Sequence, residues 1–433
     1  MDIFIGVIVG LIVLMILVVV HEFGHFIASR RNGVNVLEFG IGFPPRAVAW
    51  VKDPKTHKWR KLKRSEWKSN NVTKTVGMED KKTSKAIAVK ADDKKIIQDG
   101  LIFSINWLPI GGFCQMDGES AEDERKGTFG NASFWKKTKI LFAGVAMNWL
   151  VAFIILTVLA WTGMPTFLDG QFTVDADTRV DRTPVKVASV HENSPAEKAG
   201  FLDGDYILRV DGEEVWHGAD IIEINEKHAG EEVKYDILRK GAEGCNCDQD
   251  LTLNVTLNPI DSEFLLGIAM ESSESLAYST WSAPIVGAGL TLQITGETFK
   301  GLGQLVWNLI TGVGRQFSFD DSVRESGREA ISTVGDSVTG PIGILGILFP
   351  SFVSTGAANV AFIAALISIS LACMNVLPIP ALDGGRWVLI GFFKLRHKKL
   401  TNELEEKIVT RAVMVLLALI VIVTILDITR FFR

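Results

Sequence analysis

The residues with the clearest chemical meaning in this sequence are His21, Glu22 and His25, which stand close together near its start. On a helix, side chains at positions i and i+4 lie on one face, so both imidazoles can bind one zinc ion. A carboxylate beside zinc can take a proton from a water whose pKa the metal has lowered, and later pass it to a leaving amine. The His-Glu-x-x-His pattern therefore predicts a zinc-dependent peptidase with Glu22 as general base.

The stretch that contains this motif is predicted to cross a membrane. Residues 3–20 hold no charged residue, and about 17–25 apolar residues are enough to span a bilayer. Met1 and Asp2 give no basic start and no Ala-x-Ala site follows, so we expect a retained helix and not a cleaved signal peptide. An ionisable group in such a helix costs about 2.5–3.5 kcal/mol and is usually functional. The motif is therefore expected to have a function.

Apolar residues make up 47% of the 433 residues and are concentrated in a few stretches. Residues 140–159, 360–376 and 412–426 resemble residues 3–20 in this respect. We therefore expect a polytopic α-helical membrane protein with about four transmembrane helices. These helices are placed within residues 1–30, 137–163, 355–390 and 408–430.

The connecting segments differ in charge. Residues 30–139 carry 23 Lys+Arg against 13 Asp+Glu, residues 164–350 carry 13 against 30, and residues 394–411 carry six against three. The positive-inside rule places the two basic segments in the cytoplasm and the acidic segment outside, with both termini outside too. The zinc motif then lies toward the cytoplasmic side.

A third metal ligand is sought near the end of the third span, since two histidines leave zinc one protein ligand short. Pro378 and Pro380 break that helix, and Asp383 follows directly. Gly384 and Gly385 let the chain turn closely around this carboxylate. Asp383 is a candidate ligand, although a simple charge at a helix end is an alternative interpretation.

The connecting segments have different predicted structures. Residues 31–136 are predicted to form a β-rich, membrane-associated cytoplasmic loop with a lysine-rich insertion at residues 52–100. Residues 283–350 are glycine-dotted and carry polar side chains, which favours interfacial amphipathic helices over a fifth transmembrane helix. Cys245 and Cys247 lie in an acidic external loop, where a lone Cys-x-Cys is weak evidence for a disulfide or a metal site.

The external residues 170–275 resemble a PDZ domain. Ser194 and Pro195 supply the start of a short helix that Gly200 ends, and Asp211-Gly212 supplies a hairpin turn between predicted strands. Further strands are predicted near residues 233–238, 251–257 and 264–270. Such an α+β domain captures peptide ends by strand addition, or else it screens access to the membrane site by its bulk. Both interpretations remain open.

Together these segments resemble the site-2 protease family of intramembrane metalloproteases, in particular the bacterial regulator of sigma E protease type. The resemblance rests on His21-Glu-Phe-Gly-His25, on Asn375-Val-Leu-Pro-Ile-Pro-Ala-Leu-Asp383-Gly-Gly385 and on the PDZ-like segment between them. Segments 108–119, 143–148 and 340–343 support it. The sequence departs from the family pattern in residues 42–45, in Val145, in the insertion and in having one PDZ domain in place of two.

The resemblance implies that Zn²⁺ is held by His21, His25 and Asp383, that Glu22 is the base and that Asn375 faces the substrate. It also implies a location in the bacterial inner membrane and single-pass membrane proteins as substrates, including anti-sigma factors or signal-peptide remnants. The lipid bilayer is a further expected partner, and so are peptide C-termini that bind at the PDZ domain. Nucleic acid is not an expected partner.

Two other classes of function are alternatives to proteolysis. A membrane-anchored PDZ adaptor with a non-catalytic metal site has no need of Glu22. An ion transporter calls for polar groups on the other spans, and residues 140–159 and 412–426 supply almost none. Intramembrane proteolysis is therefore the favoured interpretation.

Overall fold

The computed structural model describes residues 2–431 apart from residues 53–57, 63, 65–100, 120–124, 167, 169, 217, 242–247, 263, 272–274, 318–319 and 338–339. Two compact units make up the chain. The first consists of Met1–Val158 and Gly287–Arg433, and the second of Leu159–Val286. Cys245 and Cys247 lie outside the described residues, as does most of the lysine-rich insertion.

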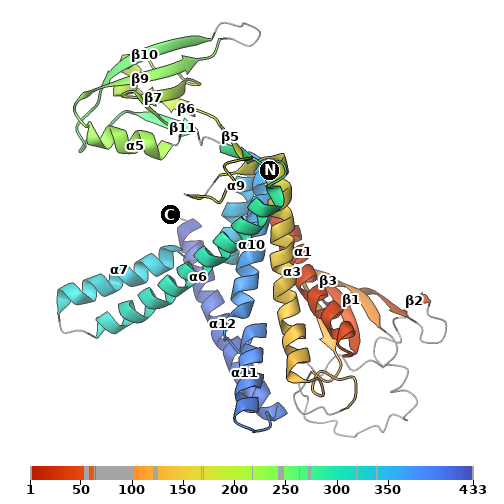
Figure 1. The fold of residues 1–433 in the computed structure, drawn as a ribbon. Helices are drawn as coiled ribbons and strands as arrows, with labels where there is room; N and C mark the ends of the chain where they lie inside the picture. Colours follow the sequence, from red (N-terminus) through yellow and green to blue (C-terminus); the bar gives the residue numbers. More distant parts are fainter. Residues whose placement is uncertain are drawn as a thin grey trace. The chain divides into compact units, whose positions relative to one another are not determined.

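Long apolar helices dominate the first unit (Figure 1). Within the described residues, four helices are long and apolar enough to cross a membrane, which confirms the expected number. Their uniformly apolar surfaces suit contact with lipid on one side and with each other on the other. They are α1 (Asp2–Arg31), α3 (Phe134–Thr162), α10 (Ala357–Val376) and α12 (Asn402–Phe431).

Further helices separate and follow these spans. The expected amphipathic segment contains α6 (Ala283–Gln316) and α7 (Asp321–Ser337), and then α8 (Pro341–Gly343), the π-helix η3 (Ile344–Leu348) and α9 (Phe349–Thr355). Helix α11 (Asp383–Leu395) comes after α10. Gly6 and Gly10 of α1 let α9 approach, because a Cβ at either position would lie 2.5–2.7 Å from Pro350 or Phe349.

A small sheet lies against the helices of the first unit. It consists of β1 (Val36–Lys52), β2 (Trp59–Lys61) and β3 (Ile102–Met116) in the order β2-β1-β3. Both long strands fold back on themselves, so that Phe39 of β1 pairs with Cys114 on one side and with Phe103 on the other. This sheet confirms the expected β-rich loop, and β2 belongs to the predicted insertion.

One apolar core joins the sheet to the helices that carry the site. Phe39, Cys114 and Met116 of the sheet are buried with Ile140 and Leu141 of α3. Phe26 of α1 and Trp387 of α11 pack against the same cluster. Since buried apolar area is the main source of stability, this core fixes α1, α3 and α11 around one point.

The second unit is an α+β domain built on an antiparallel sheet of order β10-β9-β7-β6-β11. Ser194 accepts a hydrogen bond from the Glu197 N–H at 3.2 Å and Gly200 ends α4 with a φ of 91°, as the sequence predicts. Asp211 and Gly212 form the expected hairpin turn, with φ of 52° and 83°. The strand expected over residues 264–270 begins only at Ile268, because Gly267 has a φ of 85° and its carbonyl accepts a hydrogen bond from His191.

The bounds of the remaining elements of this unit are as follows. The main sheet contains β6 (Val185–Val190), β7 (Tyr206–Val210), β8 (Glu213–Glu214), β9 (Glu232–Arg239), β10 (Gln249–Thr256) and β11 (Ile268–Glu271), with helices α4 (Pro195–Ala199) and α5 (Gly218–Lys227). A second sheet of order β4-β12-β5 contains Met164–Pro165, Ser275–Tyr278 and Arg179–Arg182.

Candidate metal centre

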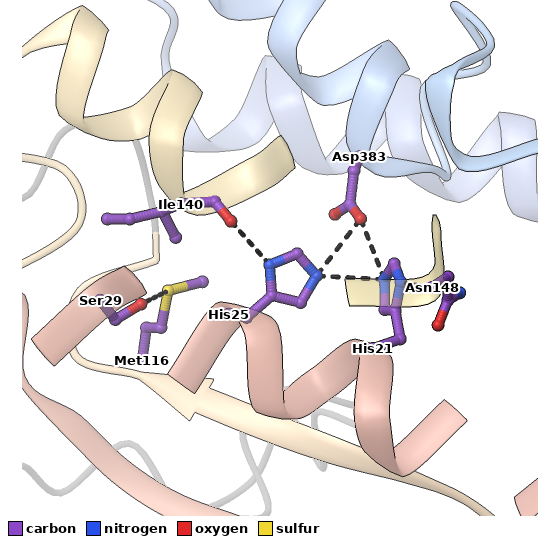
Figure 2. A network of polar contacts seen from close by, with 7 residues as sticks. All are labelled: His21, His25, Ser29, Met116, Ile140, Asn148 and Asp383. Carbon is purple, nitrogen blue, oxygen red and sulfur yellow. Dashed lines mark hydrogen bonds and ion pairs between the residues drawn. The ribbon is translucent and has the colours of Figure 1, made fainter. Parts of the chain in front are cut away.

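Three side chains converge in the first unit where α1 faces α11 (Figure 2). The Nε2 atoms of His21 and His25 lie 3.1 Å apart. Asp383 Oδ2 lies 3.2 Å from the first nitrogen and 3.3 Å from the second. Both histidines are buried, whereas the Asp383 side chain retains 21% of its exposure. The three ligands expected from the sequence are thus brought together.

The spacing of these donor atoms fits zinc. Ligand bonds of about 2.0–2.2 Å at tetrahedral angles place neighbouring donor atoms roughly 3.3–3.5 Å apart. The distances of 3.1–3.3 Å between the two nitrogens and the oxygen are close to these values. Two imidazoles and one carboxylate also form a donor set typical of catalytic zinc, which keeps its fourth position open. Among the described residues, this is the group of His, Cys, Asp and Glu side chains suited to a metal ion.

Asp383 reaches the histidines because the chain unwinds just before it. Helix α10 ends at Val376, and Asp383 is the first residue of α11. Between them, Ile379 donates a backbone hydrogen bond to Leu377 and Leu382 donates one to Ile379, each at 2.8 Å. The two prolines therefore end the helix as predicted, and the short loop satisfies part of its own backbone.

The glycines after Asp383 permit this close turn. A Cβ on Gly384 would overlap the Val376 carbonyl, and one on Gly385 would overlap the Ile379 carbonyl. Backbone atoms cannot give way as a flexible side chain can. The start of α11 can therefore lie against the end of α10 only with glycine at both positions.

The second nitrogen of each imidazole faces α3. His25 Nδ1 lies 2.8 Å from the Ile140 carbonyl, to which it donates, and this leaves Nε2 free to bind a metal. His21 Nδ1 lies 3.4 Å from the side-chain amide nitrogen of Asn148. Asn148 is fully buried and its Oδ1 has no hydrogen-bond partner among the described residues. Rotating this amide by half a turn would bring Oδ1 to His21 Nδ1–H and satisfy both groups.

Gly144 completes the wall that α3 presents to the histidines. A Cβ at this position would lie 2.6 Å from His25 Nε2 and 2.8 Å from His21 Nε2. Gly144 and Asn148 were not assigned a role from the sequence, where they appeared only within the family-like segment 143–148. The available signal was Asn148 itself, a polar residue in a helix whose following turns are apolar.

Glu22 lies beside the three candidate ligands. Its carboxylate interacts electrostatically with both histidines and with Asp383, and it accepts a hydrogen bond from the backbone of Cys114. Burial raises the pKa of the Cys114 thiol well above its usual range, so this cysteine stays neutral. Strand β3 therefore holds Glu22 through its backbone, without contributing a thiolate ligand.

Asn375 lies in the last turn of α10 and is half-buried. Among the contacts of the described residues, its side chain makes no hydrogen bond to His21, His25 or Asp383. Its expected role at the substrate is therefore still a prediction.

A buried His-His-Asp donor set with a carboxylate beside it, carried on helices of membrane-spanning length, is the arrangement of a membrane-embedded metallopeptidase. The model of peptidase family M50 matches residues 9–62 and 84–420. The chain therefore belongs to peptidase family M50, which confirms the resemblance to the site-2 proteases. The unmatched residues between these segments lie within the predicted insertion.

Relatives match along nearly the whole chain. The zinc metalloprotease RasP of Shouchella clausii is 28% identical, over 96% of this chain and 97% of the relative. The regulator of sigma-W protease RasP of Bacillus subtilis is 26% identical, over 98% and 99% respectively. A solved PDZ domain of an SdrC-like protein from Listeria monocytogenes is 24% identical, over 21% of this chain and 92% of that one, with a TM-score of 0.18.

Proposed function

We propose that this protein is an intramembrane zinc protease that hydrolyses peptide bonds in or near the transmembrane segments of single-pass membrane proteins. The observation that carries this proposal is the convergence of His21, His25 and Asp383 on helices α1 and α11, with α1 long and apolar enough to span a bilayer. A substrate that reaches these side chains has to enter the same apolar surroundings.

The residues divide the chemistry among themselves. His21, His25 and Asp383 hold the metal, and Glu22 accepts the proton of the attacking water and returns it to the leaving amine. Zinc in this site supplies Lewis acidity, which lowers the pKa of bound water and polarises the scissile carbonyl. The Cys114 backbone holds Glu22 in reach of this proton. The Ile140 carbonyl and Asn148 fix the orientation of the two imidazoles.

The membrane arrangement belongs to the same proposal. The charge bias of the connecting segments supports a cytoplasmic sheet of β1, β2 and β3 and an extracytoplasmic second unit. The bacterial relatives support a location in a bacterial inner membrane. The second unit, a PDZ-type domain, then receives peptide ends outside, and Asn375 contacts the substrate near the metal. The Bacillus subtilis relative is named as a regulator of sigma-W protease, which supports substrates that regulate a sigma factor.

The test compares two variants of the full chain in membranes that contain a tagged single-pass substrate. Glu22→Gln should keep its zinc and lose cleavage by a factor of about 10²–10⁴, the typical contribution of a general base. Asp383→Ala should lose both, because two imidazoles bind zinc more weakly than three ligands do. Cleavage by Glu22→Gln at the parent rate, or full zinc content in Asp383→Ala, would show that the assigned roles are wrong.

A further inference from the structure

A basic cavity lies beside the start of α3 and the end of α11, two helices that carry residues of the metal centre. It has a volume of about 230 Å³ and is lined by Lys137, Lys394 and Lys398, which we call the lysine pocket. Its apolar walls include Phe134, Ile390 and Leu400. No carboxylate belongs to the described residues that line it. Three positive charges around a partly apolar hollow point to an anion that also has an apolar part.

The lysine pocket lies where two candidate spans begin. Lys137 is in the first turn of α3, which starts at Phe134. Lys394 is in the last turn of α11, and Lys398 and Leu400 belong to the short link before α12, which starts at Asn402. The ends of membrane-spanning helices lie at the level of the lipid headgroups. The pocket therefore opens at the depth of lipid phosphates, whichever side of the membrane this is.

Neutral groups hold the lysines in place. Lys137 Nζ donates one of its three hydrogens to the Gly130 carbonyl at 2.8 Å, and its residue is only 9% exposed. Lys394 Nζ lies 4.5 Å from the centre of the Phe134 ring. The Lys398 backbone donates to the Phe393 carbonyl at 3.0 Å. These contacts position the ammonium groups of Lys137 and Lys394 and the backbone of Lys398, and they neutralise none of the three charges.

Glu405 does not cancel the positive charge of the lysine pocket. Glu405 of α12 interacts with Lys137 through space, but it pairs with Arg386 at 3.2 Å. Arg386 also lies close to Lys137, but its charge and that of Glu405 offset each other. The local excess of positive charge therefore persists, and it favours binding of an anion.

We propose that the lysine pocket binds the phosphate of an anionic phospholipid. The phosphate contacts the three ammonium groups, and the apolar walls contact the glycerol and the first methylenes of the acyl chains. These walls and the headgroup depth favour a lipid over a free phosphate ester. The ligand joins α3, which carries Gly144 and Asn148, to α11, which begins with Asp383. Where the proposed proteolysis holds, anionic lipid therefore stabilises the metal centre by holding these two helices together.

The experiment uses the full chain with the Glu22→Gln substitution, so that binding is measured independently of cleavage. The protein is reconstituted in phosphatidylcholine vesicles, and the association of spin-labelled phosphatidylglycerol is measured by electron paramagnetic resonance, relative to spin-labelled phosphatidylcholine. Lys394→Gln and Lys398→Gln should each lower this preference at least about fivefold, because each removes one of the three charge-assisted contacts to the phosphate. Both lysines are exposed, so the variants are expected to fold.

Two comparisons decide between specific and general attraction. Lys136 and Lys139 are exposed on the same turns of α3 but do not line the pocket. The Lys136→Gln/Lys139→Gln pair removes twice the charge of either single variant and should still leave the preference within about twofold of the parent. An equal loss in this pair would overturn the proposal in favour of general surface attraction. Full competition by glycerol 3-phosphate would overturn the assignment to a lipid in favour of a soluble phosphate ester.

The regulatory part is tested separately in the chain with Glu22 restored. Phosphatidylglycerol should raise the zinc affinity and the rate of cleavage in the parent but not in Lys394→Gln/Lys398→Gln. Binding of the lipid with no change in zinc affinity would refute the link to the metal centre while leaving the site itself in place. A parent that binds the lipid and never cleaves would count against the proposed proteolysis alone.

Discussion

Asn148 offers the sharpest test of how α3 supports the metal centre. Its side chain is fully buried and lies 3.4 Å from His21 Nδ1. When His21 binds a metal through Nε2, its Nδ1 carries a hydrogen that needs an acceptor. Asn148→Leu removes the acceptor and leaves a buried N–H unsatisfied, which costs about 1–3 kcal/mol. We therefore expect zinc affinity to fall by about 10–100-fold, the usual effect of losing such a support.

Zinc affinity can be measured by competition with a chelator, in the purified full chain. Asn148→Asp keeps an oxygen acceptor and should retain affinity close to that of the parent. Ser368→Ala serves as the matched control, because Ser368 donates to the Asn148 main-chain carbonyl at 2.8 Å and does not touch His21. Equal affinity in Asn148→Leu and the parent would refute the reasoning. So would an equal loss in Ser368→Ala, which would indicate general loosening between α3 and α10.

Two further predictions concern Gly144 and Asp177. Gly144→Ala should lower the zinc content measured in a metal assay at least tenfold, because its Cβ would lie 2.6 Å from His25 Nε2. Gly303→Ala is the control, since its Cβ would meet nothing within 4 Å, and it should match the parent. Hydrogen bonds from Ser282 and Thr280 hold the pKa of Asp177 below its usual range, so this carboxylate should stabilise the second unit at neutral pH and lose that effect as pH falls below about 4. The check is hydrogen exchange at residues 280–282, corrected for the intrinsic rate. Exchange should rise on acidification in the parent and be fast at every pH in Asp177→Asn. Equal protection of these residues in the variant and the parent at neutral pH would contradict the assigned role of Asp177.

The sequence was informative where one residue type has a direct chemical or conformational consequence. The i, i+4 spacing predicted that His21 and His25 share a face, and two prolines predicted the break that presents Asp383. Charge-free stretches predicted the number of candidate spans, since bilayer thickness fixes their length. Ser194 and Gly200 predicted the limits of α4 because caps satisfy backbone groups locally.

Features that depend on packing between distant segments were not predictable in this way. Gly144 and Asn148 act through the far side of the imidazoles, and their role appears only once α3 lies against α1. The strand β1 pairs with β3 on both sides, a topology that local periodicity does not encode. Helix α5 is absent from the predicted succession of strands, although its sequence has a clear amphipathic pattern. The late start of β11 follows from the backbone of Gly267, which alternation of side chains does not reveal.

The separation of the candidate ligands along the chain has a consequence for biosynthesis. His21 and Asp383 are 362 positions apart, so a ribosome working at about 5–20 residues per second needs roughly 20–70 s to pass from one to the other. During that interval the nascent α1 can already lie in the membrane with His21 and His25, two of the three candidate ligands. The metal centre is completed only when α11 emerges and docks, so an unfinished chain at the translocon carries no working protease among the other nascent membrane proteins.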